Sequence, residues 1–410
     1  MRLLWISDRM YGSSSAYSKH TFEVCVRLVE LGHKVAHLPM GYANQMGKQV
    51  YKGVLVLNSD ADSPFGEASA EHEYIDFKAD LIFTNKEPWV FNHLFKQALN
   101  IVPMVIIDHA PVSGQITSRL HYTFRNIAIS RFGQRELQKK GISSTYIPLG
   151  ARTDIYKPLP KADCKKAFML NPDDFVIGIV AMNRSRKMLP QMLRGFKRFM
   201  DLNPDIKTKL FLWTNVLPSR SPSDMSLGVA DVGVNLVPEI YELGLGDHVN
   251  WTKWDDIERA GGLPDFDPTG KWDMCRLYNS FDVLLGTTGG EGAGLPYLEA
   301  NACGVPSVYT NYAAAPEYAG PTGVPVNAEN YVVINTPGTR YYVADVDGIA
   351  EGLRKIYDAD RVKLALRCRA FAEKMCWENI IKDYWTPFLR ECESELYPLI
   401  TKSGVSSWSS

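Results

Sequence analysis

The sequence predicts an α/β protein of two similar domains, each built around a doubly wound parallel sheet. Its 410 residues exceed what one hydrophobic core usually serves, since domains cluster at roughly 100–200 residues. An apolar strand at 2–7, an amphipathic helix at 17–31 and a strand at 35–38 give the order that begins a parallel sheet. The same alternation starts again at 175–181, after the proline-containing segment 157–160.

We place the first domain at 1–158 and the second at 159–380. A helix at about 380–402 is expected to pack back on the first domain, and the serine-rich tail 403–410 is expected to be disordered. The other strands of the first domain are expected at 53–57, 81–84, 104–108, 127–130 and 145–147. Those of the second domain are expected at 209–213, 248–251, 283–285 and 307–309, with helices at 189–200, 295–302, 348–357 and 361–374.

Composition and charge argue against several classes of protein. Apolar residues make up 45% and the formal net charge is -1 without a long run of one sign, so no nucleic-acid partner is expected. The seven cysteines are never spaced as C-x-x-C, which disfavours a disulfide framework and a structural zinc site. Asp8 comes too early for a signal peptide, and no apolar run approaches the ~20 residues of a membrane span. We expect a cytoplasmic protein with reduced thiols and at most peripheral membrane contact.

One segment, 289–306, carries most of the functional information. Its four glycines before Leu295 let the backbone approach a ligand, and Pro296 suits the first turn of a helix whose free N–H groups can hold a diphosphate. Glu291 and Glu299, with seven residues between them, can both face one polyhydroxylated ligand. A glycine-rich turn beside an ordinary helix is the alternative, and it leaves the paired carboxylates unexplained.

This segment resembles the E-x7-E signature of the retaining GT-B glycosyltransferases of family four, the glycosyl transferases group 1, which has the form EGFGLPxLEAMACGxP. The matching residues are Glu291, Gly292, Gly294, Leu295, Pro296, Leu298, Glu299, Ala300, Ala302, Cys303, Gly304 and Pro306. Shorter matches follow the family's order at 31–35, 130–133, 147–150, 156–158, 344–350 and Trp377. The resemblance implies a GT-B fold, in which two Rossmann-like domains face each other across a cleft, the first for the acceptor and the second for a nucleotide-sugar donor.

The resemblance also implies roles for these residues. Glu291 is expected to hold the sugar hydroxyls and Glu299 the nucleotide ribose, while Gly292, Gly294, Leu295 and Pro296 are expected to line the donor site. Glu317 resembles a further family position, although an exposed acidic residue explains it equally.

The family places a basic pair after the first strand of the second domain, where it neutralises the departing diphosphate. Lys187 falls at the family's lysine, and Asn183 and Arg186 also fit a common variant of the segment, with Asn183 expected to bind the donor. Met182 stands where that variant has arginine, and Arg184 is the candidate substitute. A solvated basic helix start is the alternative explanation of Arg184 and Arg186.

In the first domain, the expected strand 104–108 ends at Asp108 and is followed by His109, and the resemblance implies a histidine or aspartate near the reacting sugar at about this point. His109 is the catalytic candidate. A structural histidine is the alternative. Gly12 and Ser13, in the loop after the first strand, could bind phosphate through backbone N–H groups, or could form a plain strand–helix turn.

The function implied is transfer of a hexose-type sugar from a UDP- or GDP-sugar, such as UDP-glucose or GDP-mannose, to an acceptor hydroxyl with retention of anomeric configuration. No cofactor or metal is expected, because the sequence has neither an aspartate-rich motif nor a His/Cys cluster with ligand spacing. Acceptor contacts are expected from loops of the first domain, at 40–52 and 58–73. A nucleotide-sugar epimerase or phosphorylase of the same fold, and a non-catalytic nucleotide-sugar binding protein, remain alternatives.

Overall fold

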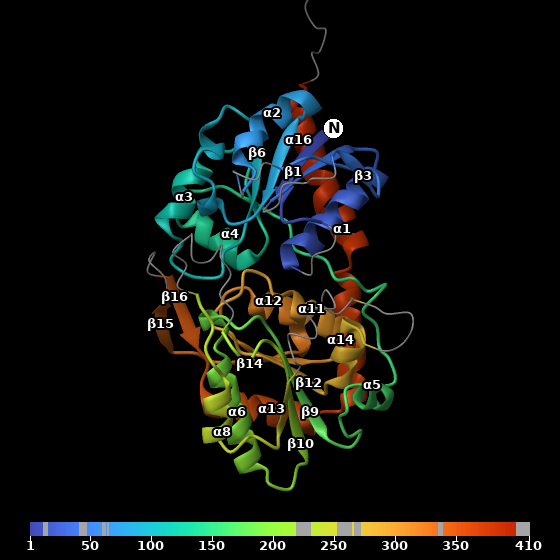
Figure 1. Cartoon of the computed structure of the whole chain (residues 1–410), viewed down its shortest axis with the longest axis vertical. Helices are drawn as coiled ribbons and strands as arrows, with labels where there is room; N and C mark the ends of the chain where they lie inside the picture. The colour runs from blue at the N-terminus through green and yellow to red at the C-terminus, as the bar shows by residue number, and fades with distance from the viewer. Residues whose placement is uncertain are drawn as a thin grey trace, which may run out of the picture.

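The computed structural model describes residues 1–10, 15–40, 47–59, 63, 65–218, 231–251, 265, 272–334 and 339–398. The chain forms two α/β domains, one above the other in Figure 1, each with its own sheet. The end of the helix predicted at 380–402 and the tail predicted to be disordered at 403–410 lie outside the described residues.

The first sheet has eight strands in the order β3-β4-β2-β1-β5-β6-β7-β8, and its strands are parallel except for the β3–β4 pair. The strands are β1 (Arg2–Ser7), β2 (Lys34–Pro39), β3 (Gln49–Tyr51), β4 (Val54–Val56), β5 (Leu81–Asn85), β6 (Ile101–Val105), β7 (Ile127–Ala128) and β8 (Thr145–Tyr146). The helices are α1 (Ala16–Glu30), α2 (Glu67–Phe77), α3 (Gly114–Leu120) and α4 (Arg131–Gln138), with short 3-10 turns η1 (Pro88–Val90) and η2 (Leu94–Lys96).

Strand β1 shows why this sheet is buried on both faces. Leu3 and Trp5 point into a core that they share with α1, whereas Leu4 and Ile6 point into a separate core beneath α2. Successive strand residues point to opposite faces, so a continuous apolar run is what a parallel sheet covered by helices on both sides requires.

The second sheet has six parallel strands in the order β11-β10-β9-β12-β13-β14. The strands are β9 (Phe175–Val180), β10 (Thr208–Trp213), β11 (Val249–Trp251), β12 (Val283–Gly286), β13 (Ser307–Thr310) and β14 (Val324–Val326). The helices are α5 (Lys161–Ala167), η3 (Ser185–Lys187), α6 (Leu189–Leu202), α8 (Val237–Glu242), α10 (Met274–Ser280), α11 (Leu295–Ala302), α12 (Ala315–Ala319), η4 (Gly320–Thr322), α13 (Val346–Asp358) and α14 (Arg361–Lys374).

Helices also cover both faces of the second sheet. Phe175, Ile177 and Ile179 of β9 pack in one core with α6, α8 and α13. Val176, between them in the sequence, points to the opposite face, which α10 and α11 cover. A separate hairpin of β15 (Asn330–Ile334) and β16 (Thr339–Val343) follows β14.

The end of the chain returns to the first domain. Helix α15 (Trp377–Ile380), the π-helical turn η5 (Ile381–Trp385) and helix α16 (Thr386–Leu396) run along the first sheet, where α16 lies beside α1 in Figure 1. The Trp385 ring lies 5.7 Å from that of Trp5 and 5.6 Å from that of Phe83. No helix in the described ranges is long and apolar enough to span a membrane.

Most predicted elements are present, including α11 and α14 at their predicted bounds. The strand predicted at 104–108 is instead β6, Ile101–Val105. Strand β7 pairs with Met104 and Val105, so residues 106–108 continue as a loop. The sequence analysis also did not predict the β15–β16 hairpin.

Candidate functional site

The predicted basic segment and glycine-rich segment meet at the switch point of the second sheet. The chain runs outward in opposite directions from β9 and β12, which are neighbours at the centre. Ligands of doubly wound sheets bind outside the carboxyl ends of the strands at such a point. Lys187 follows β9 in η3, and Glu291 follows β12.

The glycine loop after β12 lies directly against the first domain. A Cβ atom on Gly290 would be 2.1 Å from the backbone oxygen of Asp108, and one on Gly292 would be 2.3 Å from Cγ2 of Ile106. Because no side chain fits at either position, glycine is needed for this close approach. The loop is therefore held next to the segment that follows β6.

Helix α11 begins where the glycine loop ends. Gly294 has a φ of 101°, in the left-handed region, and offers no side-chain cap, while Pro296 lies in the first turn. Leu295 and Pro296 are half-buried. The backbone N–H groups of this first turn and the positive end of the helix dipole suit an anionic ligand.

Glu291 lies beside two cationic side chains. Its Oε1 is 2.5 Å from Nζ of Lys187, and its Oε2 is 3.7 Å from Nη1 of Arg186. Burial and the nearby Arg186 charge lower the pKa of Lys187, although Glu291 opposes this shift. The lysine is therefore a half-buried donor at the switch point, paired with a carboxylate.

His109 and Asp108 form a pair on the first-domain side of this cluster. His109 Nδ1 lies 2.7 Å from Oδ1 of Asp108. Burial would raise the pKa of Asp108, but the His109 hydrogen bond and the Arg186 charge lower it. In a neutral His109 ring, a hydrogen bond from Nδ1 to the carboxylate of Asp108 leaves Nε2 as an acceptor. Within the described ranges, the buried Nε2 has no hydrogen-bond partner.

Arg186 joins the two domains at this cluster. Its Nη1 lies 3.7 Å from Asp108 of the first domain, and its Nε lies 3.2 Å from Asp231 of the second. Arg184, the predicted substitute for the family arginine, donates instead to the backbone oxygen of Asp231 at 3.2 Å. The structure thus places Arg186, rather than Arg184, beside Glu291.

Asn183 holds backbone segments together. Its amide nitrogen donates to the oxygens of Asn215 and Val234 at 2.8 and 2.7 Å, and its amide oxygen accepts from the Val234 N–H at 3.1 Å. Both amide hydrogens are therefore engaged by backbone carbonyls, and Asn183 supports the loops around the site.

Glu299 is buried at the other end of the signature segment. Tyr278 donates to its Oε2 at 2.6 Å, and Nζ of Lys19, from α1 of the first domain, lies 3.3 Å from Oε1. Lys19 is also 2.7 Å from Asp265. The second glutamate thus pairs with a cation from the opposite domain.

Of the remaining predicted residues, the structure describes only Glu317, which lies apart from this cluster. Gly12 and Ser13 fall outside the described residues. Glu317 accepts from the backbone N–H of Arg131 at 2.8 Å and from the hydroxyl of Tyr146, so it ties the two domains together. In the part of the chain that the structure describes, no group of three or more His, Cys, Asp or Glu side chains could hold a metal ion.

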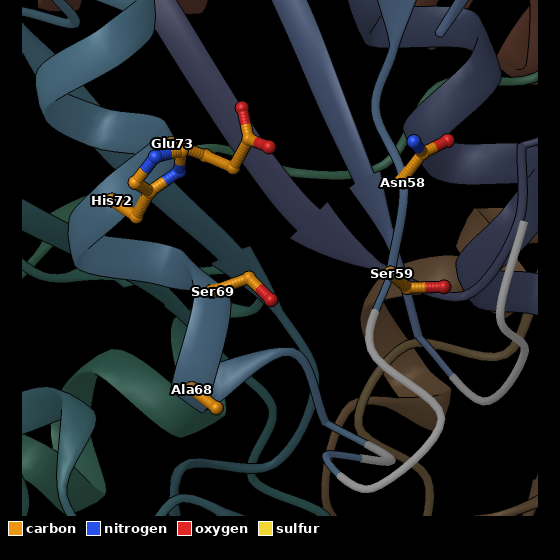
Figure 2. A pocket seen from close by; sticks show the side chains of 6 residues that line it. All are labelled: Asn58, Ser59, Ala68, Ser69, His72 and Glu73. Carbon is orange, nitrogen blue, oxygen red and sulfur yellow. The ribbon is translucent and has the colours of Figure 1, made fainter. Parts of the chain in front are cut away.

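A polar cavity of about 360 Å³ lies in the stretch 58–73 of the first domain. Figure 2 shows its walls: helix α2 on one side and the segment after β4 on the other. The lining residues are Asn58, Ser59, Ala68, Ser69, His72 and Glu73. Hydroxyl, amide and carboxylate groups of this kind suit a hydroxyl-rich ligand.

The sequence analysis did not identify Asp108, Lys19 or Tyr278 as part of the site. The sequence could have indicated Asp108, because a carboxylate directly before His109 can form a hydrogen bond with its ring. No sequence pattern indicated Lys19 or Tyr278, because their partner Glu299 is distant in the sequence.

Comparison with known proteins shows what part of the chain is similar to. Residues 243–358 match the model of the glycosyl transferases group 1. A D-inositol 3-phosphate glycosyltransferase of Mycobacterium sp. (strain KMS) is 28% identical over 159 residues, which are 39% of this chain and 30% of that protein. Another of that name, from Saccharomonospora viridis, is 23% identical over 232 residues, 56% of this chain and 46% of that protein. The matches thus span less than half of these relatives.

Solved structures share the fold over nearly the whole chain. Sucrose-phosphate synthase from Thermosynechococcus elongatus superposes with a TM-score of 0.71 at 17% identity, covering 95% of this chain and 99% of that one. Anabaena HepE in complex with UDP and glucose superposes with a TM-score of 0.67 at 14% identity, covering 95% and 100%. These similarities confirm the predicted GT-B fold.

Proposed function

We propose that this chain, whose residues 243–358 match the model of the glycosyl transferases group 1, transfers a hexose-type sugar from a UDP- or GDP-sugar to an acceptor hydroxyl with retention of configuration. One observation carries the proposal. At the switch point of the second sheet, the Lys187–Glu291 pair meets the Asp108–His109 pair of the first domain, with Arg186 between them. Cations, carboxylates and an acceptor nitrogen converge there from both domains.

Each group has a chemical task in such a transfer. Negative charge develops on the departing diphosphate, and Lys187, Arg186 and the N-terminus of α11 can stabilise it. Glu291 accepts hydrogen bonds from the sugar hydroxyls once Lys187 turns to the phosphate, and Nε2 of His109 accepts from another hydroxyl. We assign no covalent nucleophile. The acceptor oxygen bonds to the anomeric carbon on the face that the diphosphate leaves, and the acceptor's proton passes to the departing phosphate oxygen.

The transfer proposed here is independent of metal ions. Lys187 and Arg186 are fixed at the switch point and supply the positive charge that a diphosphate leaving group needs. Turnover should therefore persist in excess EDTA. Abolition by the chelator, with recovery on adding Mg²⁺ or Mn²⁺, would show that this donor-site arrangement is wrong.

The first test is a donor screen by thermal shift, because a ligand that binds the folded state raises its apparent stability. UDP-glucose, GDP-mannose and their nucleotide diphosphates are the first candidates. UDP-glucose is the first donor to test, because the HepE structure has been solved in complex with it. Phosphorylated polyols are the first acceptors to test, because relatives are named for inositol 3-phosphate.

Product analysis then separates the candidate activities. A glycosyltransferase releases nucleotide diphosphate and forms a glycoside only when acceptor is present, and the anomeric configuration of that glycoside reports retention. An epimer formed without acceptor would indicate an epimerase, and a sugar phosphate formed from a glycoside and inorganic phosphate would indicate a phosphorylase. Tight binding without turnover across the panel would indicate a binding protein.

A further inference from the structure

Lys19 reaches across the domain interface to the Glu299 end of the site. Ser15 caps α1 by accepting from the Ser18 N–H at 3.1 Å, which sets Lys19 at the start of the helix. Its Nζ lies 2.7 Å from Oδ1 of Asp265 and 3.3 Å from Oε1 of Glu299. A third contact, of 3.4 Å, joins Nζ to the hydroxyl of Tyr156. The short contact to Asp265 anchors the ammonium group, and the two longer contacts are the ones that a ligand oxygen could replace.

The partners of Lys19 are themselves fixed. Tyr278 donates to the other oxygen of Glu299 at 2.6 Å, and Tyr156 donates to Asp265 at 2.7 Å. Burial would lower the pKa of Lys19, but the carboxylates of Glu299 and Asp265 raise it. The first domain thus presents a permanent cation beside the carboxylate expected to bind the ribose.

We propose that Lys19 and Glu299 bind the ribose hydroxyls of the nucleotide together, with Lys19 as a donor-binding residue contributed by the first domain. This inference rests on the proposed function, from which the nucleotide comes. A hydroxyl donates one hydrogen bond and accepts others, so its hydrogen can go to Glu299 while its oxygen accepts from the ammonium group. Lys19 keeps Asp265 and exchanges its contact to Glu299 for the ribose oxygen.

The Lys19–Glu299 pair spans the two domains. Glu299 lies on α11 of the second domain and Lys19 on α1 of the first. A ribose held by both side chains would link the domains, so nucleotide binding would favour the arrangement in which the sugar site is complete.

The test is a comparison of three nucleotides by isothermal titration calorimetry: UDP, 2′-deoxy-UDP and 3′-deoxy-UDP, with the same set based on GDP in parallel. Lys19→Met should weaken UDP binding by about tenfold, as for the loss of one charged hydrogen bond. For the deoxynucleotide that lacks the contacted hydroxyl, the same substitution should weaken binding less than threefold, because that contact is already absent. If Lys19→Met does not fold, Lys19→Gln replaces it, since its neutral amide can still donate to Asp265. The loss of the charge should then weaken the binding of UDP more than that of the deoxynucleotide that lacks the contacted hydroxyl.

Arg152→Met is the matched control. Arg152 lies 3.5 Å from Asp265 and 2.9 Å from Glu23, so it belongs to the same chain of charges without contacting Glu299. It should leave the binding of all three nucleotides within about twofold of wild type. Equal losses for the three nucleotides in Lys19→Met, or tighter UDP binding, would overturn the role of Lys19 and leave the proposed function standing. A wild-type chain that binds neither UDP nor GDP would reject both.

Discussion

The two glutamates of the signature segment are both paired with a lysine, but the lysines come from different places. Glu291 pairs with Lys187 of its own domain at 2.5 Å, whereas Glu299 pairs with Lys19 of the other domain at 3.3 Å. The Glu291–Lys187 pair requires only that the second domain is folded. The second pair also needs the first domain in place.

This difference separates the two ends of the donor site. At the Glu291 end, the strand ends of one sheet fix the positions of the charged groups, so the groups proposed to meet the reacting sugar are preorganised. At the Glu299 end, a buried tyrosine of the same domain orients the carboxylate, and the opposite domain supplies the cation. The Glu291 end is therefore suited to transition-state stabilisation and the Glu299 end to binding that depends on domain arrangement.

The largest effect should come from Lys187. Lys187→Ala removes a half-buried charge that can meet the leaving diphosphate, so kcat/KM should fall by about 10²–10³. Steady-state kinetics with the donor identified by the thermal-shift screen measure this. Lys197→Ala is the control. Lys197 pairs with Asp201 one turn further along helix α6, at the surface, so this variant should keep the wild-type kcat/KM. A near-normal rate for Lys187→Ala would move the phosphate role to Arg186.

The glutamates themselves should differ in which kinetic constant changes. Glu291→Gln should lower kcat by about 10², because hydrogen bonds to the sugar strengthen as the glycosidic bond breaks. Glu299→Gln should mainly raise the donor KM, by about tenfold, because the ribose does not change during transfer. Free nucleotide diphosphate should lose affinity in the Glu299 variant alone. Equal losses of nucleotide affinity in both variants would contradict this division of roles.

The two ends also differ in how well the sequence predicts them. Helix α11 and the positions of Lys187 and Glu291 follow from local patterns, because apolar strands, glycines and a switch point fix where the loops after β9 and β12 meet. Lys19 carries no such signal, since a lysine near the start of an amphipathic helix is ordinarily solvated. Its contact with Glu299 depends on how the two domains dock, which local periodicity does not encode.

The basic segment after β9 shows a different limit of prediction from the sequence. Arg184 and Arg186 are two residues apart, and the sequence alone does not show which of them faces Glu291. The short turn η3 settles the choice, because the backbone N–H of Arg186 donates to Asp231 at 3.0 Å and its side chain follows toward the first domain. The strand before His109 was misplaced for a similar reason, because its length depends on the short partner β7.

The arginines provide the next prediction. Arg186→Met should lower kcat/KM by about tenfold to a hundredfold, because it removes a cation beside Glu291 and Asp108. Arg184→Met is the matched variant and should change kcat/KM less than threefold, since its bond goes to a backbone oxygen at Asp231. The ratio of the two losses in kcat/KM, measured at the same donor concentrations, decides which arginine has the phosphate role. A larger loss in Arg184→Met would return the phosphate role to that residue.

The smallest effect should come from Tyr278, which acts on the donor only through Glu299. Burial and the Glu299 charge raise the pKa of Tyr278, so its hydroxyl stays protonated and donates to the carboxylate. Tyr278→Phe leaves a buried oxygen of Glu299 without this donor, which should cost about 1–3 kcal/mol of unfolding free energy and raise the donor KM severalfold, with kcat preserved.

Tyr318→Phe separates the change in KM from the change in stability. The Tyr318 hydroxyl is also buried, but it donates to Ile129 and accepts from Leu149 of the first domain, away from Glu299. It should destabilise the protein to a similar extent in a denaturant titration while leaving the donor KM unchanged. If both variants raised KM equally, the effect would come from loosened domain docking, and the orientation of Glu299 by Tyr278 would not be needed to explain donor affinity.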